Sequence, residues 1–401
     1  MGARNGADAL TGHAVTQLVP RRVISALLAG VFISTFARFL MPPMLLAMAG
    51  DFSVTLAVIS LAASAYFLTY GLAQPVWGII SDRIGRVAVM RTALLLSALF
   101  DAASAIPMPV GLFIAVRALS GACMAGVFPA ALIYIGDAIH DPKERQPRIA
   151  LLMSGVAMGI TLGTLAAGLG VETIGWRAFY VITAILSALV AWYVSRVPEP
   201  QRPAPLPVIR AFSLVLASGW SWLLYALVFV EAGVLLGGFA MIPASVELAG
   251  GTPALAGLLT AGYGVSVLVM SAIARSVSAR WAAAILITIG GAGAFVGYTL
   301  IAIDVSPVFV VLSVVLLGVA WVFMHSTLQT WATSLSAEAR ATAVSLFAGF
   351  MFFGNAVGTM IAGVALQDSG SRALFMSLAA IAFVLTVVAA TSRRRFEHRL
   401  V

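Results

Sequence analysis

The sequence is poor in cysteine and in charged residues. It contains one cysteine, Cys123, and only 9% of its 401 residues are Asp, Glu, Lys or Arg. A single cysteine excludes an intramolecular disulfide and a cysteine-based metal site, and the four histidines show no ligand spacing. The chain also lacks a P-loop, a GxGxxG after a strand, an HExxH and a nucleophile–His–acid grouping. These absences predict a protein that is not an enzyme, hydrolyses no ATP and holds neither a metal nor an organic cofactor.

Hydrophobic residues are abundant instead. They make up 61% of the chain, and the mean hydropathy is +1.05. A soluble globular chain carries about 45–50% apolar and about 25% charged residues. Apolar runs long enough to cross a bilayer recur from one end of the chain to the other. We therefore expect an all-α polytopic membrane protein whose surroundings are the lipid bilayer. The net charge of +8 does not predict nucleic-acid binding, since its location matters more than its sum.

The apolar runs are separated by charges, glycines and prolines, and these breaks predict twelve transmembrane helices. The first six are expected over residues 22–48, 54–80, 92–107, 110–137, 148–171 and 177–196. The second six are expected over residues 215–246, 254–274, 281–303, 308–331, 342–366 and 372–391.

One polar, proline-rich connection divides these helices into two groups of six. It reads VPEPQRPAPLPVIR and occupies residues 197–210. The expected organisation is a cytoplasmic tail, a six-helix bundle, a cytoplasmic linker, a second six-helix bundle and a basic tail, over residues 1–20, 21–196, 197–212, 213–391 and 392–401.

The basic residues test the helix count, because cytoplasmic loops carry an excess of Lys and Arg. With twelve helices, 19 of the 23 basic residues fall on one side of the membrane. The opposite side receives mainly acidic residues, among them Asp51, Glu172 and Asp304. This partition predicts a multi-pass protein of the cytoplasmic (inner) membrane with both termini in the cytoplasm.

An internal repeat relates the two groups of helices. At a constant offset of 195 residues, the segment 148–169 aligns with the segment 342–364. The matched pairs include Arg145 with Arg340, Arg177 with Arg372, Gly159 with Gly354 and Gly163 with Gly358. Parallel repeats of six helices joined by a linker are typical of transporters whose halves rock around a central site. We expect two pseudo-symmetric bundles of this kind.

The loop after the second helix resembles a known signature. The run from Gly78 to Arg86, GIISDRIGR, is similar to the motif between helices 2 and 3 of the major facilitator superfamily. Arg117 to Gly121, RALSG, is similar to a second motif of that superfamily, in helix 4. The stretch GWRAFYVI at 175–182 resembles the superfamily's twelve-helix drug:proton antiporter branch. Within a glycine-rich run, Ile160 stands where that branch has proline. The resemblance implies the major facilitator fold and alternating-access transport.

The resemblance also implies a role for the charged loop. Asp82 would lie at the end of helix 2, near the N-terminus of helix 11, whose partial positive charge favours a carboxylate. Glycine would allow close helix contact and a tight turn. The expected conformational gate consists of Gly78, Asp82, Arg83, Gly85, Arg86 and Arg91.

Few ionisable residues interrupt the spanning helices, and such residues tend to face a cavity or a partner. Arg38, Arg117, Glu231 and His325 lie in helices 1, 4, 7 and 10, which by the resemblance surround the central pathway. Burial disfavours the charged form of a carboxylate, so Glu231 would take up and release a proton. We expect proton coupling through Glu231, Arg117 and His325, although a structural ion pair or hydrogen bond is the alternative for each. By the resemblance, Asp101 lies off the pathway.

Arg38 has several possible roles. It would pair with an acid, hold a substrate carboxylate or phosphate, or repel cations.

Polar, aromatic and methionine side chains on neighbouring helix faces would line a mostly apolar pocket, unless they serve only helix packing. The candidate substrate-binding residues are Arg38, Tyr66, Tyr70, Gln74, Met124, Phe128, Glu231, His325, Gln329 and Asn355.

These features predict a secondary active transporter that exports a small organic or amphiphilic compound by proton-coupled antiport. The coupling ion would be the proton, and the chain would function as a monomer with no obligate protein partner. Proton-coupled uptake or exchange of an organic anion is the main alternative, since Arg38 and Arg117 are both cations. A membrane sensor or scaffold that has lost transport is a more remote one.

Overall fold

The structure is a computed structural model that describes residues 20–139, 141–200, 208–277, 280–336, 338–397 and 399. All regular structure within these ranges is helical. The first half of the chain forms α1 (Arg21–Phe39), η1 (Pro42–Met44), α2 (Leu45–Phe52), α3 (Leu56–Ile84), α4 (Arg86–Ser104), α5 (Val110–Met124), α6 (Val127–Ala138), α7 (Pro142–Ile174) and α8 (Trp176–Val194). The second half, which begins with a short helix after the linker, forms α9 (Val208–Leu216), α10 (Gly219–Ala232), η2 (Gly233–Gly237), α11 (Ile242–Leu248), α12 (Pro253–Val277), α13 (Ala283–Ile303), α14 (Pro307–Ala320), η3 (Trp321–His325), α15 (Ser326–Ser334) and α16 (Arg340–Glu397).

Eleven of the helical stretches in the described residues are long and apolar enough to cross a membrane. The last of them runs over 56 residues, from Thr342 to Glu397. At 1.5 Å per residue this is about 84 Å, more than twice the hydrocarbon thickness of a bilayer. Gly370 divides it, since its φ of 78° is not helical. The stretch therefore makes two crossings, and the prediction of twelve is confirmed.

Several spans contain a short segment that is not α-helical. The first span bends through the 3₁₀ turn at Pro42–Met44, because proline cannot donate a backbone hydrogen bond. The spans that begin with α10 and α14 each contain a π-helical segment, Gly233–Gly237 and Trp321–His325. Helix α16 continues to Glu397, beyond the expected limit of 391, and α9 occupies part of the expected linker.

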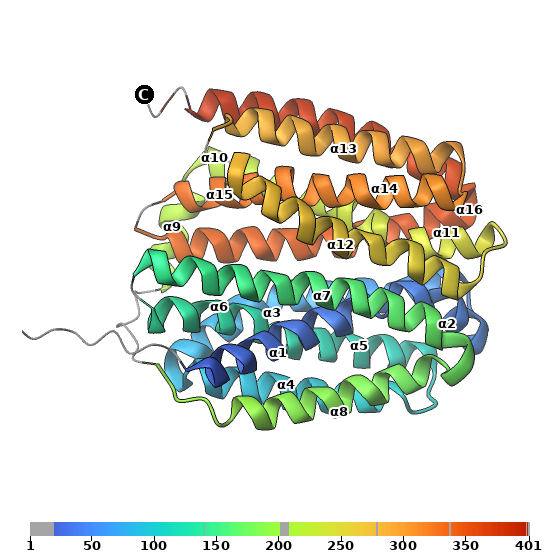
Figure 1. Ribbon diagram of the computed structural model, residues 1–401, viewed down its shortest axis with the longest axis horizontal. Helices are drawn as coiled ribbons and strands as arrows, with labels where there is room; N and C mark the ends of the chain where they lie inside the picture. The colour runs from blue at the N-terminus through green and yellow to red at the C-terminus, as the bar shows by residue number, and fades with distance from the viewer. Residues whose placement is uncertain are drawn as a thin grey trace, which may run out of the picture.

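The two halves lie side by side, as predicted from the repeat. Figure 1 shows the blue and green helices of the first half below the yellow and red helices of the second half. Two pairs of helices join the halves, since α7 packs against α12 and α3 packs against α16. The turn η1 of the first half also contacts α11 and α12, so the interface consists of two main helix seams with a smaller contact beside them.

The seam between α7 and α12 depends on small residues. A Cβ atom on Gly257 would lie 2.7 Å from both the Cα of Gly168 and the carbonyl oxygen of Thr164. Real Cβ atoms essentially never approach backbone so closely, so only glycine permits this contact. Lipid is as apolar as the side chains, so membrane helices gain little from hydrophobic burial. They associate instead through close packing, which small residues at the contact permit.

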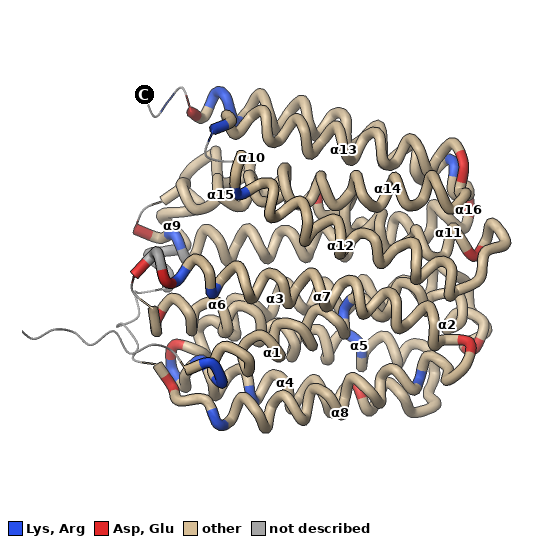
Figure 2. Tube along the Cα trace, in the orientation of Figure 1, with Lys and Arg blue, Asp and Glu red and all other residues tan. Residues whose placement is uncertain are grey.

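Charged residues gather at the two ends of the bundle, and the middle is almost free of them (Figure 2). One end, called here the basic end, receives the loop at Arg83 and Arg86 and the arginines at the end of α16. The other, called the far end, receives the turn at Asp51, which forms a 2.5 Å ion pair with Arg177. This agrees with the partition of charge expected from twelve crossings.

We expect Gly257→Ala to destabilise the protein, because the added methyl group overlaps the backbone of α7. Overpacking of this kind costs about 1–3 kcal/mol. Gly136→Ala is the matched control, since a Cβ there meets nothing within 4 Å and alanine is the better helix former. Thermal unfolding in detergent should give a lower midpoint for Gly257→Ala than for wild type. Equal midpoints for the two variants would show that α7 and α12 do not pack this closely.

Candidate functional site

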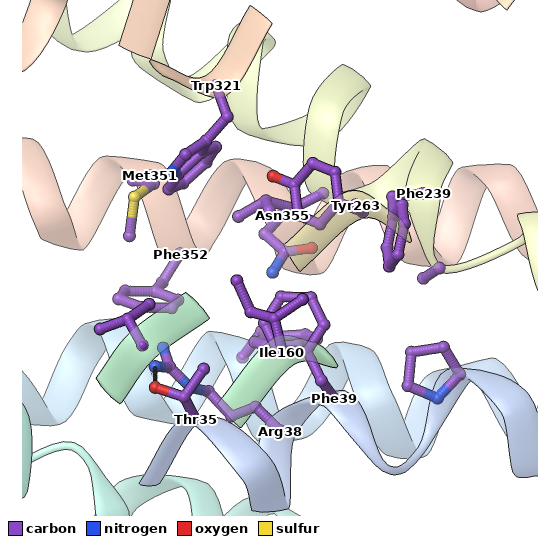
Figure 3. A pocket seen from close by; sticks show the side chains of 15 residues that line it. Thr35, Arg38, Phe39, Ile160, Phe239, Tyr263, Trp321, Met351, Phe352 and Asn355 are labelled. Carbon is purple, nitrogen blue, oxygen red and sulfur yellow. Dashed lines mark hydrogen bonds between the residues drawn. The ribbon is translucent and has the colours of Figure 1, made fainter. Parts of the chain in front are cut away.

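A cavity lies between the two halves, at mid-bundle. Its volume is about 80 Å³, which is room for on the order of six water molecules. Figure 3 shows side chains from both halves converging on this space. The lining residues of the first half are Thr35, Arg38, Phe39, Pro42, Phe67, Val156 and Ile160. Those of the second half are Leu236, Phe239, Ala240, Tyr263, Trp321, Met351, Phe352 and Asn355.

Arg38 is the only charged residue among the described residues that line the cavity. Its Nε donates to the carbonyl oxygen of Ser34 at 3.1 Å, and its Nη2 donates to Oγ1 of Thr35 at 3.1 Å. The guanidinium also lies 4.9 Å from the ring centre of Tyr70 and 5.6 Å from that of Phe352. Among the described residues, no Asp or Glu lies within ion-pair distance of Arg38. An ion pair with an acid was one of the possible roles of Arg38, and the described structure shows no such pair.

Asn355 faces Arg38 from the other half of the protein (Figure 3). Its Oδ1 accepts a 3.1 Å hydrogen bond from Thr359, one turn further along α16. The amide nitrogen is left to face the cavity. The wall between the two polar groups is apolar and includes Ile160. The cavity thus offers an amide and a cation at opposite sides of a hydrophobic space.

Glu231 and His325 meet in the interior of the second half. Nδ1 of His325 lies 3.0 Å from Oε2 of Glu231, and the two side chains are 7% and 0% exposed. One proton between these atoms makes the hydrogen bond, whether the histidine or the carboxylic acid carries it. The other carboxyl oxygen, Oε1, is buried with no hydrogen-bond partner in the described structure. The pair is therefore a buried hydrogen-bonded carboxyl–imidazole contact with one carboxyl oxygen left over.

Both members of this pair adjoin π-helical segments. Glu231 lies two residues before η2, and His325 is the last residue of η3. A π segment shifts the backbone register, and other donors must satisfy the carbonyl groups it frees. The Tyr298 hydroxyl donates to the Val234 carbonyl in η2, and the Thr327 hydroxyl donates to the Phe323 carbonyl in η3. These bonds hold the two segments in the register that brings Glu231 to His325.

Trp321 connects the cavity to the buried pair. Its indole lines the cavity and stacks on the imidazole of His325, with ring centroids 3.9 Å apart and planes inclined by 12°. Because the rings are in contact, a ligand that moves the indole also moves the imidazole. Protonation of His325 likewise changes the electrostatics on the indole face.

Arg117 and Asp101 form a second buried pair, in the first half. Nη1 of Arg117 lies 2.8 Å from Oδ1 of Asp101, and the side chains are 2% and 1% exposed. The same carboxylate oxygen accepts a 2.7 Å hydrogen bond from Ser120. The guanidinium lies between the rings of Tyr66 and Tyr180, at 4.9 and 4.5 Å. Sequence reasoning placed Asp101 off the pathway and missed that it neutralises Arg117.

A stack of aromatic rings joins this pair to the cavity. Tyr66 covers Arg117 and stacks on Tyr70, with ring centroids 6.1 Å apart. Tyr70 in turn covers Arg38 and contacts Phe352 at 4.4 Å. Tyr66 and Tyr70 were predicted to bind substrate, but in the described structure neither lines the cavity, because Tyr70 lies against Arg38 and Tyr66 against Arg117.

The remaining predicted substrate residues lie away from the cavity lining. Gln74 and Met124 are buried, Phe128 is half-buried, and Gln329 is exposed. None of the four belongs to the residues that line the cavity in the described structure. Their role in substrate binding stays a prediction.

The charged loop at the basic end is organised around Arg86. Its guanidinium bonds Asp82 at 2.6 Å and Asp137, from α6, at 3.0 Å. Arg83 and Arg91, by contrast, are exposed. Arg86 therefore ties together three helices of the first half, and sequence reasoning missed the second of its carboxylates.

The linker contributes to the same loop. Gly85 has a φ of 112°, so the tight turn expected there uses a conformation that favours glycine. The carboxylate of Glu199 accepts hydrogen bonds from the backbone nitrogens of Arg86 and Val87, the latter at 3.0 Å. A carboxylate satisfies the free donors at a helix N-terminus and interacts favourably with its partial charge. Gly78 has no atom within 4 Å of where its Cβ would be, so no helix packs on it in this arrangement.

The site holds no evident metal centre, because no three His, Cys, Asp or Glu residues cluster within the described part of the chain. The chemistry available is proton transfer at Glu231 and His325 and ligand binding in the cavity.

Comparison with known proteins agrees with this picture. The family model for the Major Facilitator Superfamily matches residues 27–339 and 249–400. The chain is 31% identical over 219 residues to the inner membrane transport protein YnfM of Escherichia coli, covering 52% of this chain and 51% of that protein. It is 27% identical over 180 residues to multidrug resistance protein D of Escherichia coli, covering 45% of each. The chain thus spans about half the length of the curated relatives it matches.

The fold is also found among solved structures. A bacterial homologue of the human lysosomal transporter Spinster, in an inward-facing and unoccupied conformation, superposes with a TM-score of 0.76 at 19% identity. The alignment covers 94% of this chain and 98% of that one, so the similarity extends over both halves.

We expect Asp101→Asn to destabilise the protein strongly, because it leaves Arg117 buried without a counter-charge. Removing one partner of a buried pair costs about 3–5 kcal/mol. Asp51→Asn is the matched control, since its pair with Arg177 is exposed and such pairs contribute about 0–1 kcal/mol. Thermal unfolding of both variants in detergent should separate them clearly. A double variant, Asp101→Asn with Arg117→Gln, should recover part of the loss; a further drop would argue against the pairing.

Proposed function

The chain belongs to the Major Facilitator Superfamily, and from this premise we propose that it is a secondary active transporter that exports a small amphiphilic organic compound in exchange for protons. The cavity between the halves is the proposed substrate site, and Glu231 with His325 is the proposed proton site. The proposed cycle needs the chain, the bilayer and an ion gradient, and no cofactor or protein partner.

The observation that carries the proposal is the 3.0 Å contact between Glu231 and His325 inside the second half. Buried polar groups usually have hydrogen-bond partners. Here Oε1 of Glu231 has no partner in the described structure. Among the described residues, Asp101 also leaves one carboxylate oxygen, Oδ2, without a partner, but it faces the permanent cation Arg117, whereas Glu231 faces a histidine, which is charged only if protonated. Transient protonation of the Glu231 carboxyl group relieves this cost, which favours a site that takes up and releases protons.

Coupling to the substrate follows from Trp321. Its indole touches both the cavity and His325, so substrate and proton occupancy act on one side chain. In the proposed cycle, the halves separate at one end while they close at the other. The two seams, α3 with α16 and α7 with α12, are the contacts that form and break.

The basic end is the proposed cytoplasmic side of an inner membrane, since basic loops favour the cytoplasm. The loop around Arg86 is the proposed gate of that side. Its bonds to Asp82, Asp137 and Glu199 hold the ends of three helices and the linker as one unit. The gate would therefore move as a rigid part of the first half.

The direction of transport is proposed from the relatives. One of them is named a multidrug resistance protein, a name that describes that protein. Proton-coupled uptake of an organic anion is the second candidate, which the cation in the cavity favours. The two differ in the sign of the proton gradient that drives accumulation.

We expect Glu231→Gln to abolish transport driven by a pH gradient while leaving exchange of substrate for substrate. The test uses proteoliposomes with an acidic interior and a membrane potential clamped by K⁺ and valinomycin. Benzenesulfonate, benzenesulfonamide and phenyltrimethylammonium serve as anionic, neutral and cationic probes. Exchange of one proton per neutral molecule supports about ten-fold accumulation per pH unit, and the Gln variant should only equilibrate its substrate.

Glu172→Gln is the control, because Glu172 is exposed at the far end and should leave transport unchanged. Accumulation driven by an acidic exterior would indicate uptake by symport and contradict the proposed direction. Normal gradient-driven transport by Glu231→Gln would remove this residue from the coupling mechanism.

A further inference from the structure

The charge of Arg38 is not balanced by the protein. A cation in a largely apolar cavity is costly unless it is paired. Arg38 uses Nε and Nη2 on Ser34 and Thr35, and no carboxylate of the described structure pairs with it. The rings of Tyr70 and Phe352 stabilise the cation only in part, since such contacts are weaker than an ion pair. The Nη1 donors are left to face the cavity.

The hydrogen bonds of Arg38 hold its guanidinium in one position. Ser34 and Thr35 lie on the same helix as Arg38, one turn earlier, and Thr35 is fully buried. Tyr70 is also fully buried and lies against the guanidinium. The planar donor group is therefore held in place before a ligand arrives, which lowers the entropy lost on binding.

The rest of the cavity indicates what accompanies the anionic group. Phe39, Phe239, Tyr263 and Trp321 supply aromatic surface around a small volume. Asn355 supplies one amide on the wall opposite Arg38. The chemistry of this lining suits a molecule with an acid group at one end and an apolar ring. The cavity of about 80 Å³ is smaller than the roughly 150 Å³ that accommodates benzene, so the halves must separate to admit such a molecule.

We propose that Arg38 binds the anionic group of the transported compound, so that the substrate is a small organic anion, a carboxylate or sulfonate on an apolar ring. The inference rests on the proposed function, because it assigns the substrate of that same cavity. Guanidinium matches both oxyanions geometrically, and charge-assisted hydrogen bonds are about twice as strong as neutral ones. Cations are excluded by repulsion from Arg38, since the described lining contains no carboxylate to offset it.

Export of such an anion has an electrical consequence. One proton entering while one monovalent anion leaves moves two positive charges inward. A membrane potential that is negative inside favours the inward movement of each of these charges. The proposed substrate is thus driven out by the potential as well as by the pH gradient.

The test is equilibrium dialysis of the full chain in detergent against the three radiolabelled probes named above. Benzenesulfonate and benzenesulfonamide have the same ring and differ in charge. We expect benzenesulfonate to bind about ten-fold or more tightly than the sulfonamide, and phenyltrimethylammonium to bind least. Equal or tighter binding of the amide or the cation overturns the proposal, as does absence of benzenesulfonate binding at millimolar concentration.

Variants of the cavity test the assignment to Arg38. Arg38→Gln should reduce benzenesulfonate affinity to that of the sulfonamide, whereas Arg275→Gln, an exposed arginine of α12, should not change it. Asn355→Asp is the second variant, used whether or not Arg38→Gln folds. It places a carboxylate opposite Arg38, so it should weaken benzenesulfonate binding and strengthen phenyltrimethylammonium binding. An unchanged order of the three probes in Asn355→Asp would overturn the proposal.

Failure of this inference is separable from failure of the proposed function. Glu231→Gln should keep the preference for benzenesulfonate while losing gradient-driven transport. If wild type prefers benzenesulfonate but responds to no pH gradient, the anion site stands and the proton-coupled function fails. If a pH gradient drives only the amide or the cation, the function stands and the anion site is wrong.

Discussion

A charge inside a helix bundle surrounded by lipid must find its compensation within the protein, and this constraint organises the interior of the molecule. The described spans contain two buried ion pairs, Arg117 with Asp101 and Glu231 with His325, one in each half. A further cation of these spans, the half-buried Arg38, lies where the halves meet. Tyrosine rings join Arg117 to Arg38, and the cavity lies between Arg38 and Trp321, which stacks on His325.

The three groups differ in how completely the protein neutralises them. Arg117 has Asp101 as its counter-charge, and Ser120 and two tyrosine rings add further contacts, although Oδ2 of Asp101 and Nε of Arg117 have no partner in the described structure. Glu231 and His325 share one hydrogen bond and leave one oxygen unsatisfied. Arg38 has no counter-charge in the described structure at all. In the proposed function, this difference in compensation assigns proton exchange to the second pair and ligand binding to Arg38.

The sequence predicted the helices well because each is a long apolar run, and lipid leaves the backbone no other regular solution than a helix. It singled out Arg38, Arg117, Glu231 and His325 because ionisable residues in such runs are rare. It did not predict the partners, because Asp101 and Arg117 lie on different helices whose relative rotation depends on packing. The π segments are equally hidden, since Gly233–Gly237 and Trp321–His325 have no pattern that distinguishes them from α-helix. Glu199 was missed because a cap supplied from more than a hundred residues away has no local signal.

The cavity takes its walls from both halves, and this has a thermodynamic consequence for its ligands. A molecule bound to Arg38 and Asn355 at once is part of the contact between the halves, and its binding free energy is added to that of the two seams. A loosely held ligand lets the halves part again, whereas a tightly held one prolongs the dwell time of a single conformation. In the proposed cycle, strong affinity and rapid turnover therefore oppose each other. A high-affinity analogue that spans the two residues would act as an inhibitor and would make poor cargo.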